Sequence, residues 1–124
     1  VLKANEAVAA AARPGITLKD LNEIARQVLG EGLVSMGMIR DVSEVNKYYM
    51  HSVSHPMGID VHDISLAADV LQPGWVISDE PGLYIDEEAI GIRIEDDLLI
   101  TENGCEVLSR DIIKDPDAIE AFMA

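Results

Sequence analysis

Apolar residues recur three or four positions apart near the start of the chain, which is the spacing of one face of a helix. The alanine-rich residues 1–12 favour a first helix, and the Pro-Gly pair that follows is expected to end it. Residues 18–29 repeat the spacing, so we predict an amphipathic second helix there. Thr17 and Asp20 have the spacing of a capping box at the start of this helix.

Gly30 and Gly32 are expected to end the second helix, and residues 33–46 have no clear period, which is typical of a loop or an irregular helix. From Tyr48 onward, short apolar runs between turn residues are typical of strands. We predict three strands and a closing helix, over residues 75–80, 90–100, 106–108 and 115–123, with an Asn-Gly hairpin before the third strand. The order indicates a single α+β domain over residues 1–124, with helices packed on one face of a mainly antiparallel sheet.

Alternation along the two longer strands separates polar residues from apolar ones. In the first of these strands, Glu80 shares a face with Ser78 and comes just before a Pro-Gly turn. In the second strand (residues 90–100), the even-numbered residues form a mostly apolar face that is expected to pack on the helices. The odd-numbered face carries Arg93 and Glu95 beside a glycine, which allows close approach. An Arg-Glu pair that faces solvent would explain this second face equally well.

The charge of the chain is strongly acidic, with 23 carboxylates against 9 lysines and arginines. This balance argues against nucleic-acid binding, which needs clustered basic residues. The chain contains no run of about eighteen apolar residues that would span a membrane. Cys105 is the only cysteine, so no intrachain disulfide can form, which fits a reducing cytoplasm. Most of the acidic residues are expected to form a solvated surface.

All three histidines fall within one stretch of thirteen residues, HSVSHPMGIDVHD, which begins at His51. Pro56 argues against a helix, and the neighbouring valine and tyrosines favour a strand. On a strand, His51 and His55 point to the same face, and His62 then follows from a loop. A single histidine is more often structural than functional, but three together in a chain otherwise free of histidine weaken that explanation.

These segments can direct one imidazole and two carboxylates toward a common point. One nitrogen ligand among several oxygens suits divalent ions such as Mn²⁺, Co²⁺ or Zn²⁺. Such an ion lowers the pKa of a water molecule and polarises a substrate carbonyl. A second imidazole nearby can donate a hydrogen bond to the oxyanion that forms.

The ordered motifs HSVSHPMGIDVHD, LQPGWVISDEPGLYI and IGIRIEDDLLIT resemble the carboxy-terminal half of the pita-bread metallopeptidases, of which Xaa-Pro aminopeptidases and prolidases are the most similar branch. The resemblance extends over the whole chain, because the tail IEAFMA also looks like a family C-terminus. It implies hydrolysis of the peptide bond before a proline at the second position of a substrate. It also implies two divalent metal ions in the complete enzyme, with Mn²⁺ expected and Co²⁺ or Zn²⁺ as alternatives.

The resemblance assigns roles to six residues of this chain. His55, Glu80 and Glu95 match metal ligands, and Glu95 matches the carboxylate that bridges two ions. Glu80 also matches a carboxylate that helps to move the proton of the attacking water. His62 matches the histidine that contacts the scissile carbonyl or its oxyanion. His51 and Arg93 match residues that line the substrate pocket.

The chain departs from the family pattern at two residues of the first motif. Ser52 stands where the family usually has glycine, and Pro56 stands where it commonly has an aromatic residue or another histidine. Both are expected to alter the pocket beside the metal without removing a ligand.

Two aspartate ligands of the family come from the first half of its catalytic domain, and no stretch before His51 resembles them. Asp20 and Asp41 lack the strand context. We therefore expect the chain to be an incomplete part of an enzyme, inactive alone and weak in metal binding. Its uncovered sheet edge and apolar face are expected to promote self-association.

Two other functions remain open. A non-catalytic relative would use the same fold as a peptide- or protein-binding module, although the retained His55, Glu80 and Glu95 count against it. A creatinase-like enzyme would hydrolyse a small C–N substrate, although the wording of EPGLYI and GIRIEDD favours the peptidases.

Overall fold

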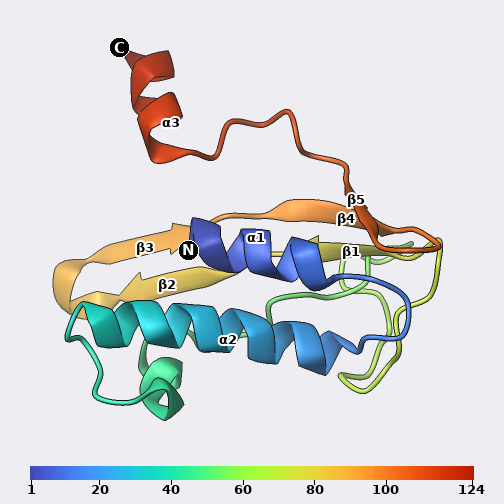
Figure 1. Ribbon diagram of the computed structural model, residues 1–124, viewed down its shortest axis with the longest axis horizontal. Coiled ribbons are helices and arrows are strands. Elements are labelled where there is room, and N and C mark those ends of the chain that lie inside the picture. The colour runs from blue at the N-terminus through green and yellow to red at the C-terminus, as the bar shows by residue number, and fades with distance from the viewer.

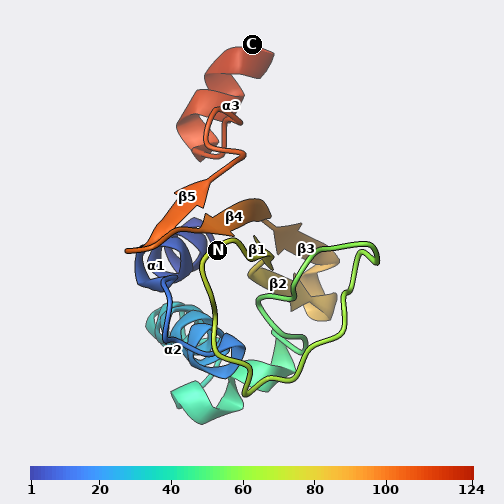
Figure 2. The same ribbon diagram turned by 90° about the vertical axis from the view of Figure 1, so that its right-hand side faces the viewer.

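A computed structural model describes the chain from Val1 to Ala124. Helices α1 (Leu2–Ala11) and α2 (Leu18–Ser35) pack against each other and lie on the same side of the antiparallel strands (Figures 1 and 2). The predicted α+β class, with helices on one face of an antiparallel sheet, is confirmed. The core lies between these layers and includes fully buried side chains from the helices and from the central strands, among them Leu21, Leu33, Ile77 and Leu98.

The start of α2 agrees with the predicted capping box. The backbone N–H of Asp20 donates to Oγ1 of Thr17 at 3.1 Å, and the backbone N–H of Thr17 donates to Oδ2 of Asp20 at 3.0 Å. These two bonds satisfy N–H groups that would otherwise lack a partner at the helix start.

The predicted end of α2 at Gly30 and Gly32 is wrong, because the helix continues to Ser35. A Cβ atom on Gly30 would lie only 2.7 Å from Cγ1 of Val42, the first residue of the short helix η1 (Val42–Lys47). Gly30 therefore serves close packing between two helices rather than helix termination.

The strands form two small antiparallel sheets. Strands β1 (Val76–Asp79), β4 (Asp96–Ile100) and β5 (Cys105–Val107) make one sheet, in the order β1-β4-β5. Strands β2 (Gly82–Ile85) and β3 (Ile90–Arg93), joined by the short helix η2 (Asp86–Glu88), make the other. The Asn-Gly hairpin between β4 and β5 is confirmed.

The long strand predicted at residues 90–100 is divided into β3 and β4, and β2 was not predicted at all. The register nevertheless runs unbroken through both sheets, because Val76 pairs with Leu99 and Gly82 pairs with Arg93 at the same offset. In Figure 1, β2 and β1 follow one another in line, as do β3 and β4. The two sheets are therefore one long hairpin whose ladder is interrupted in the middle.

The apolar face predicted for residues 90–100 is only half correct. Leu98 and Ile100 on β4 are buried against the helices, as expected. Ile90 and Ile92 on β3 remain about half exposed, so this part of the predicted apolar face is not buried against the helices.

The histidine-bearing segment runs beside β1 but is not the regular strand that was predicted. The backbone N–H groups of Ser78 and Glu80 donate to the carbonyls of His55 and Val53, at 2.9 and 2.8 Å. In return, the N–H of His55 donates to Oγ of Ser78, and the N–H of Val53 donates to Oδ1 of Asn22 on α2. These side-chain acceptors replace ladder partners, so the segment is extended but irregular.

The closing helix α3 (Pro116–Met123) forms as predicted, and Oδ1 of Asp115 accepts a hydrogen bond from the N–H of Ala118 at its start. The helix stands away from the rest of the molecule, and none of its residues is buried (Figure 2). None of the helices combines the length and apolar character needed to cross a membrane.

Candidate metal centre

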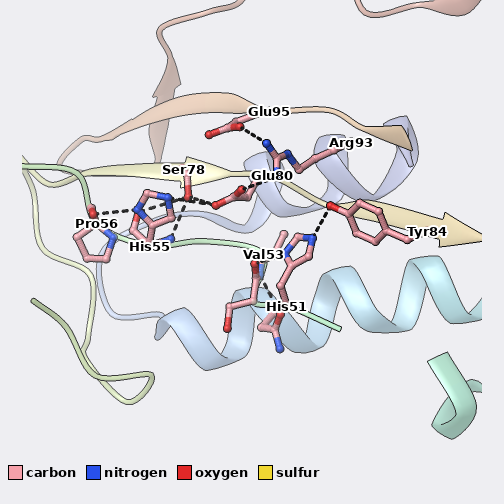
Figure 3. Close-up of polar contacts among 11 residues, drawn as sticks. His51, Val53, His55, Pro56, Ser78, Glu80, Tyr84, Arg93 and Glu95 are labelled. Atoms are coloured by element: carbon pink, nitrogen blue, oxygen red, sulfur yellow. Dashed lines mark hydrogen bonds and ion pairs between the residues drawn. The ribbon is translucent and has the colours of Figure 1, made fainter. Parts of the chain in front are cut away.

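Three predicted ligands come together at the interruption of the long hairpin. One ligand atom each from His55, Glu80 and Glu95 lies within 4.8 Å of the other two. His55 comes from the segment beside β1, Glu80 directly follows β1, and Glu95 directly precedes β4 (Figure 3). Residues far apart in the sequence thus direct one nitrogen and two carboxylate ligands toward a single point.

The strand register explains why the two carboxylates meet. Asp79 pairs with Asp96 and Gly82 pairs with Arg93, so the same register places Glu80 directly opposite Glu95. Like charges directly opposite each other on neighbouring strands are destabilising unless a cation lies between them. The backbone therefore imposes a carboxylate pair that favours cation binding.

Arg93 is the one cation that contacts this pair. Its guanidinium lies 3.9 Å from Oε2 of Glu80 and 3.8 Å from Oε2 of Glu95 (Figure 3). Contact with the hydroxyl of Tyr84, and then the negative charges of Glu80 and Glu95, raise the pKa of Arg93. The arginine side chain is half exposed and both contacts are long, so it offsets only part of the repulsion between the carboxylates.

His55 is held in the orientation that a metal ligand needs. Its Nδ1 lies 3.1 Å from the carbonyl oxygen of Pro56, which can only accept, so Nδ1 carries the hydrogen. In the neutral ring, Nε2 then presents its lone pair to Oε1 of Glu80, 3.1 Å away. Two acceptors face each other at this distance unless a proton or a metal ion lies between them. Metal-binding histidines commonly donate their other N–H to a backbone carbonyl in this way.

The side chain of Glu80 is held in place by a hydrogen bond from Ser78. The Oγ of Ser78 donates to Oε1 of Glu80 at 3.1 Å, which confirms that the two residues share a face of the strand. The side chain of Glu80 is only 13% exposed, whereas that of Glu95 is 42% exposed. Glu80 is thus the more rigidly placed of the two carboxylates.

The remaining predicted residues surround an open polar pocket beside the three ligands. The pocket has a volume of about 410 Å³, and no hydrophobic residue lines it. Its lining residues are His51, Ser52, Ser54, His55, His62, Glu80 and Arg93. The structure therefore brings His51, His62 and Arg93 to the place where the candidate ligands converge.

His62 contacts His55 directly, although the two residues lie seven positions apart in the loop. The two rings of His62 and His55 meet edge to face, with 4.3 Å between their centres. This contact places an imidazole with free donor capacity next to the candidate ligands.

His51 is fixed by Tyr84, which is not among the residues predicted for the site. Nδ1 of His51 lies 2.8 Å from the carbonyl oxygen of Ser52 and therefore donates to it. Nε2 lies 2.8 Å from Oη of Tyr84, so in the neutral ring the tyrosine hydroxyl donates to it (Figure 3). Tyr84 also contacts Arg93, and it thereby joins the two residues predicted to bind substrate. The only signal in the sequence is its position two residues after Gly82, in a strand that was not predicted.

The donor set fits a divalent cation. One imidazole nitrogen and two carboxylate oxygens form a mixed set that suits Mn²⁺, Co²⁺ or Zn²⁺. The opposed carboxylates and the lone pair of His55 leave negative potential at one point, which a dication would neutralise. Such a centre can activate water for hydrolysis, with His62 and Arg93 nearby to bind an oxyanion or a carboxylate.

Comparison with known proteins agrees with this chemistry. The sequence model described as metallopeptidase family M24 matches residues 1–102. The chain is 38% identical over 130 residues to the Xaa-Pro aminopeptidase of Escherichia coli K12, an alignment that covers 90% of the chain and 30% of that protein.

Solved structures of related proteins have the same fold. A Bacillus anthracis protein that bears the name aminopeptidase P superposes with a TM-score of 0.95 at 49% identity, over 99% of this chain and 30% of that one. Zinc-substituted aminopeptidase P from E. coli, in complex with product, superposes with a TM-score of 0.91 at 37% identity, over 99% of this chain and 32% of that one. The chain thus spans about 30% of the length of these relatives.

Proposed function

Because the chain belongs to metallopeptidase family M24, we propose that its complete gene product hydrolyses the N-terminal Xaa-Pro bond of peptides, with divalent metal held in part by His55, Glu80 and Glu95. The observation that carries this proposal is the convergence of these three ligand atoms within 4.8 Å at the interrupted hairpin. The printed name of the E. coli relative supports the Xaa-Pro specificity.

Each residue of the pocket has a proposed role in the reaction. Divalent ions, when bound, activate a water molecule and polarise the scissile carbonyl. Glu80, held by Ser78, accepts the proton of the attacking water. His62 donates a hydrogen bond to the carbonyl oxygen as negative charge develops there. His51 and Arg93, joined through Tyr84, bind the substrate beside the centre.

We propose that these 124 residues form the carboxy-terminal part of the catalytic domain and are inactive alone. In this proposal Glu95 would help to hold both ions of the complete enzyme, and the second ion would need further ligands from other parts of the gene product. The isolated chain therefore binds Mn²⁺ weakly, whereas the complete gene product binds two ions. Exposed apolar residues on β3 and α3 support the further proposal that the isolated chain self-associates, which sedimentation velocity at several concentrations tests. A monomer at high concentration would contradict that part.

The test of the proposed function uses the complete gene product with Mn²⁺. We expect hydrolysis of a peptide with proline at the second position, and none of a matched peptide with alanine there or of creatine. Glu80→Gln and Glu95→Gln should abolish hydrolysis and weaken Mn²⁺ binding in calorimetry. The control is Glu102→Gln, which changes an exposed carboxylate outside the centre and should leave both unchanged.

Two outcomes would contradict the proposal. Undiminished hydrolysis by Glu95→Gln would exclude this residue as a metal ligand. Activity of the isolated 124-residue chain equal to that of the complete gene product would show that the three ligands suffice.

A further inference from the structure

A second pair of carboxylates lies behind the metal centre, on the opposite face of the strands. Asp79 on β1 stands directly opposite Asp96 on β4, one position before Glu80 and one position after Glu95. Because side chains alternate along a strand, this inner pair points away from the pocket. Asp79 has no exposed surface and Asp96 is 3% exposed. The side chain of Asn5 on α1 donates a hydrogen bond to Asp79 at 3.2 Å.

Lys114 supplies positive charge to the inner pair. Its Nζ donates to both carboxylate oxygens of Asp96, at 2.7 and 2.8 Å. The lysine side chain is 20% exposed and reaches inward from the irregular segment between β5 and α3. Oγ of Ser109, in the same segment, donates to Asp96 as well. Charge-assisted bonds of this kind, shielded from water, are much stronger than surface ion pairs.

The position of Glu95 is sensitive to this contact because Glu95 lies at the interruption of the hairpin, where only the paired residues on either side set its register. Glu95 belongs to neither β3 nor β4, and its side chain is 42% exposed. The next residue, Asp96, is the first of β4, so its pairing with Asp79 and its bonds to Lys114 together hold the backbone directly after Glu95. Without the lysine, a buried carboxylate would face Asp79 with no counter-charge, a strongly unfavourable arrangement that movement of the strand end would relieve.

We propose that Lys114 is a positioning residue for the metal centre, which holds Asp96 so that Glu95 stands opposite Glu80. The inference rests on the proposed function only for the identity of the ligand that the centre binds. Lys114 touches none of the three candidate ligands and acts through Asp96 alone. The hairpin thus has a cation for each carboxylate pair, Arg93 on the pocket face and Lys114 on the inner face.

The test compares three variants of the complete gene product. Lys114→Met removes the clamp, and Lys114→Arg retains the charge. The matched control is Arg110→Met, which removes one positive charge from the same segment but from an exposed pair with Glu106. Crystal structures of the metal-free proteins give the position of Glu95, Mn²⁺ titration followed by electron paramagnetic resonance gives affinity, and thermal unfolding gives stability.

We expect Lys114→Met to displace Glu95 from Glu80 and to weaken Mn²⁺ binding about tenfold, the lower end of the range for residues that support metal ligands. Lys114→Arg should recover most of this loss, and Arg110→Met should change neither quantity. Unmoved Glu95 and unchanged Mn²⁺ affinity in Lys114→Met would overturn the inference, even if its melting temperature fell.

If Lys114→Met does not fold, the double variant D96N/K114M, which removes both charges, takes its place in the test. Displacement of Glu95 in that variant supports the inference, and a native position overturns it. Failure of the unmodified protein to bind Mn²⁺ would refute the proposed function. The metal-free position of Glu95 would still decide the role of Lys114.

Discussion

Replacing Asp79 by asparagine is expected to remove a pH-dependent loss of stability from the metal-free protein. Asp79 is fully buried, and its Oδ1 has no hydrogen-bond partner. Burial, and after it the charge of Asp96, raises the pKa of Asp79 from 3.8 to about 8. Lys114 acts in the opposite direction but does not cancel these effects. The folded protein therefore keeps a proton on Asp79 at pH values where the unfolded chain has lost it.

The sign and size of the effect follow from proton linkage. Because folding raises the pKa of Asp79, the contribution to stability is complete below about pH 4 and is lost as the pH rises toward about 8. Between about pH 5 and pH 7 the folded state holds about one more proton at this site than the unfolded chain. The free energy of unfolding then falls by about 1.4 kcal/mol for each pH unit, or about 3 kcal/mol over the interval.

Asparagine has nearly the same shape as aspartate, can accept the bond from Asn5 and does not ionise. Asp79→Asn should therefore lose this slope and should be more stable than the unmodified protein at pH 7 by up to about 3 kcal/mol. Urea unfolding at pH 5, 6 and 7, with a chelator present, measures the difference. Asp111→Asn, at an exposed carboxylate, is the control and should follow the unmodified protein. Parallel pH profiles for Asp79→Asn and the unmodified protein would refute the reasoning.

Two further predictions concern residues away from the pocket. Gly32→Ala should stabilise α2 by up to about 1 kcal/mol through helix propensity, because an added Cβ meets no other atom. Gly30→Ala should instead destabilise the protein by about 1–2 kcal/mol, because its Cβ would clash with Val42. Urea unfolding of both variants tests this difference, and equal effects would contradict it. Burial, and after it the charge of Asp79, raises the pKa of Cys105. The Cys105 thiol of the folded protein should therefore react with iodoacetamide at pH 8 more slowly than free cysteine, and at the same rate once the protein is unfolded in urea. Fast alkylation of the folded protein would contradict this prediction.

Much of the candidate site could be predicted because its residues follow simple strand alternation. Glu80 lies on the face of Ser78 as period two requires, and Glu95 shares its face with Arg93. His55 was assigned to a strand that does not form, yet its approach to β1 still places it beside Glu80. Local pattern and family resemblance together were sufficient for these residues.

The elements that were missed depend on contacts between distant parts of the chain. Pro81-Gly82 has the composition of a turn, but Gly82 opens β2. A Cβ there would lie 2.8 Å from Oη of Tyr84 and 3.2 Å from the carbonyl oxygen of Ile92, so the glycine permits close approach within the ribbon. Gly30 serves the same purpose against η1. Lys114 lies in a segment without any period, so nothing in its sequence context indicates a contact with Asp96.

The interruption of the long hairpin has a mechanical consequence. Both of its strands are interrupted at the same level, where one backbone hydrogen bond of 3.3 Å, from the N–H of Ile94 to the carbonyl oxygen of Pro81, joins them. Pro81 has no N–H to return this bond, so the two strands are joined here by half of the usual pair of hydrogen bonds. The outer ribbon of β2 and β3 stays fixed to the body through a backbone hydrogen bond of 2.9 Å from Tyr84 to Tyr48. The weakened level lies directly beside Glu80 and Glu95, so the spacing of these two acidic groups is expected to adjust at low cost to the size of a cation between them.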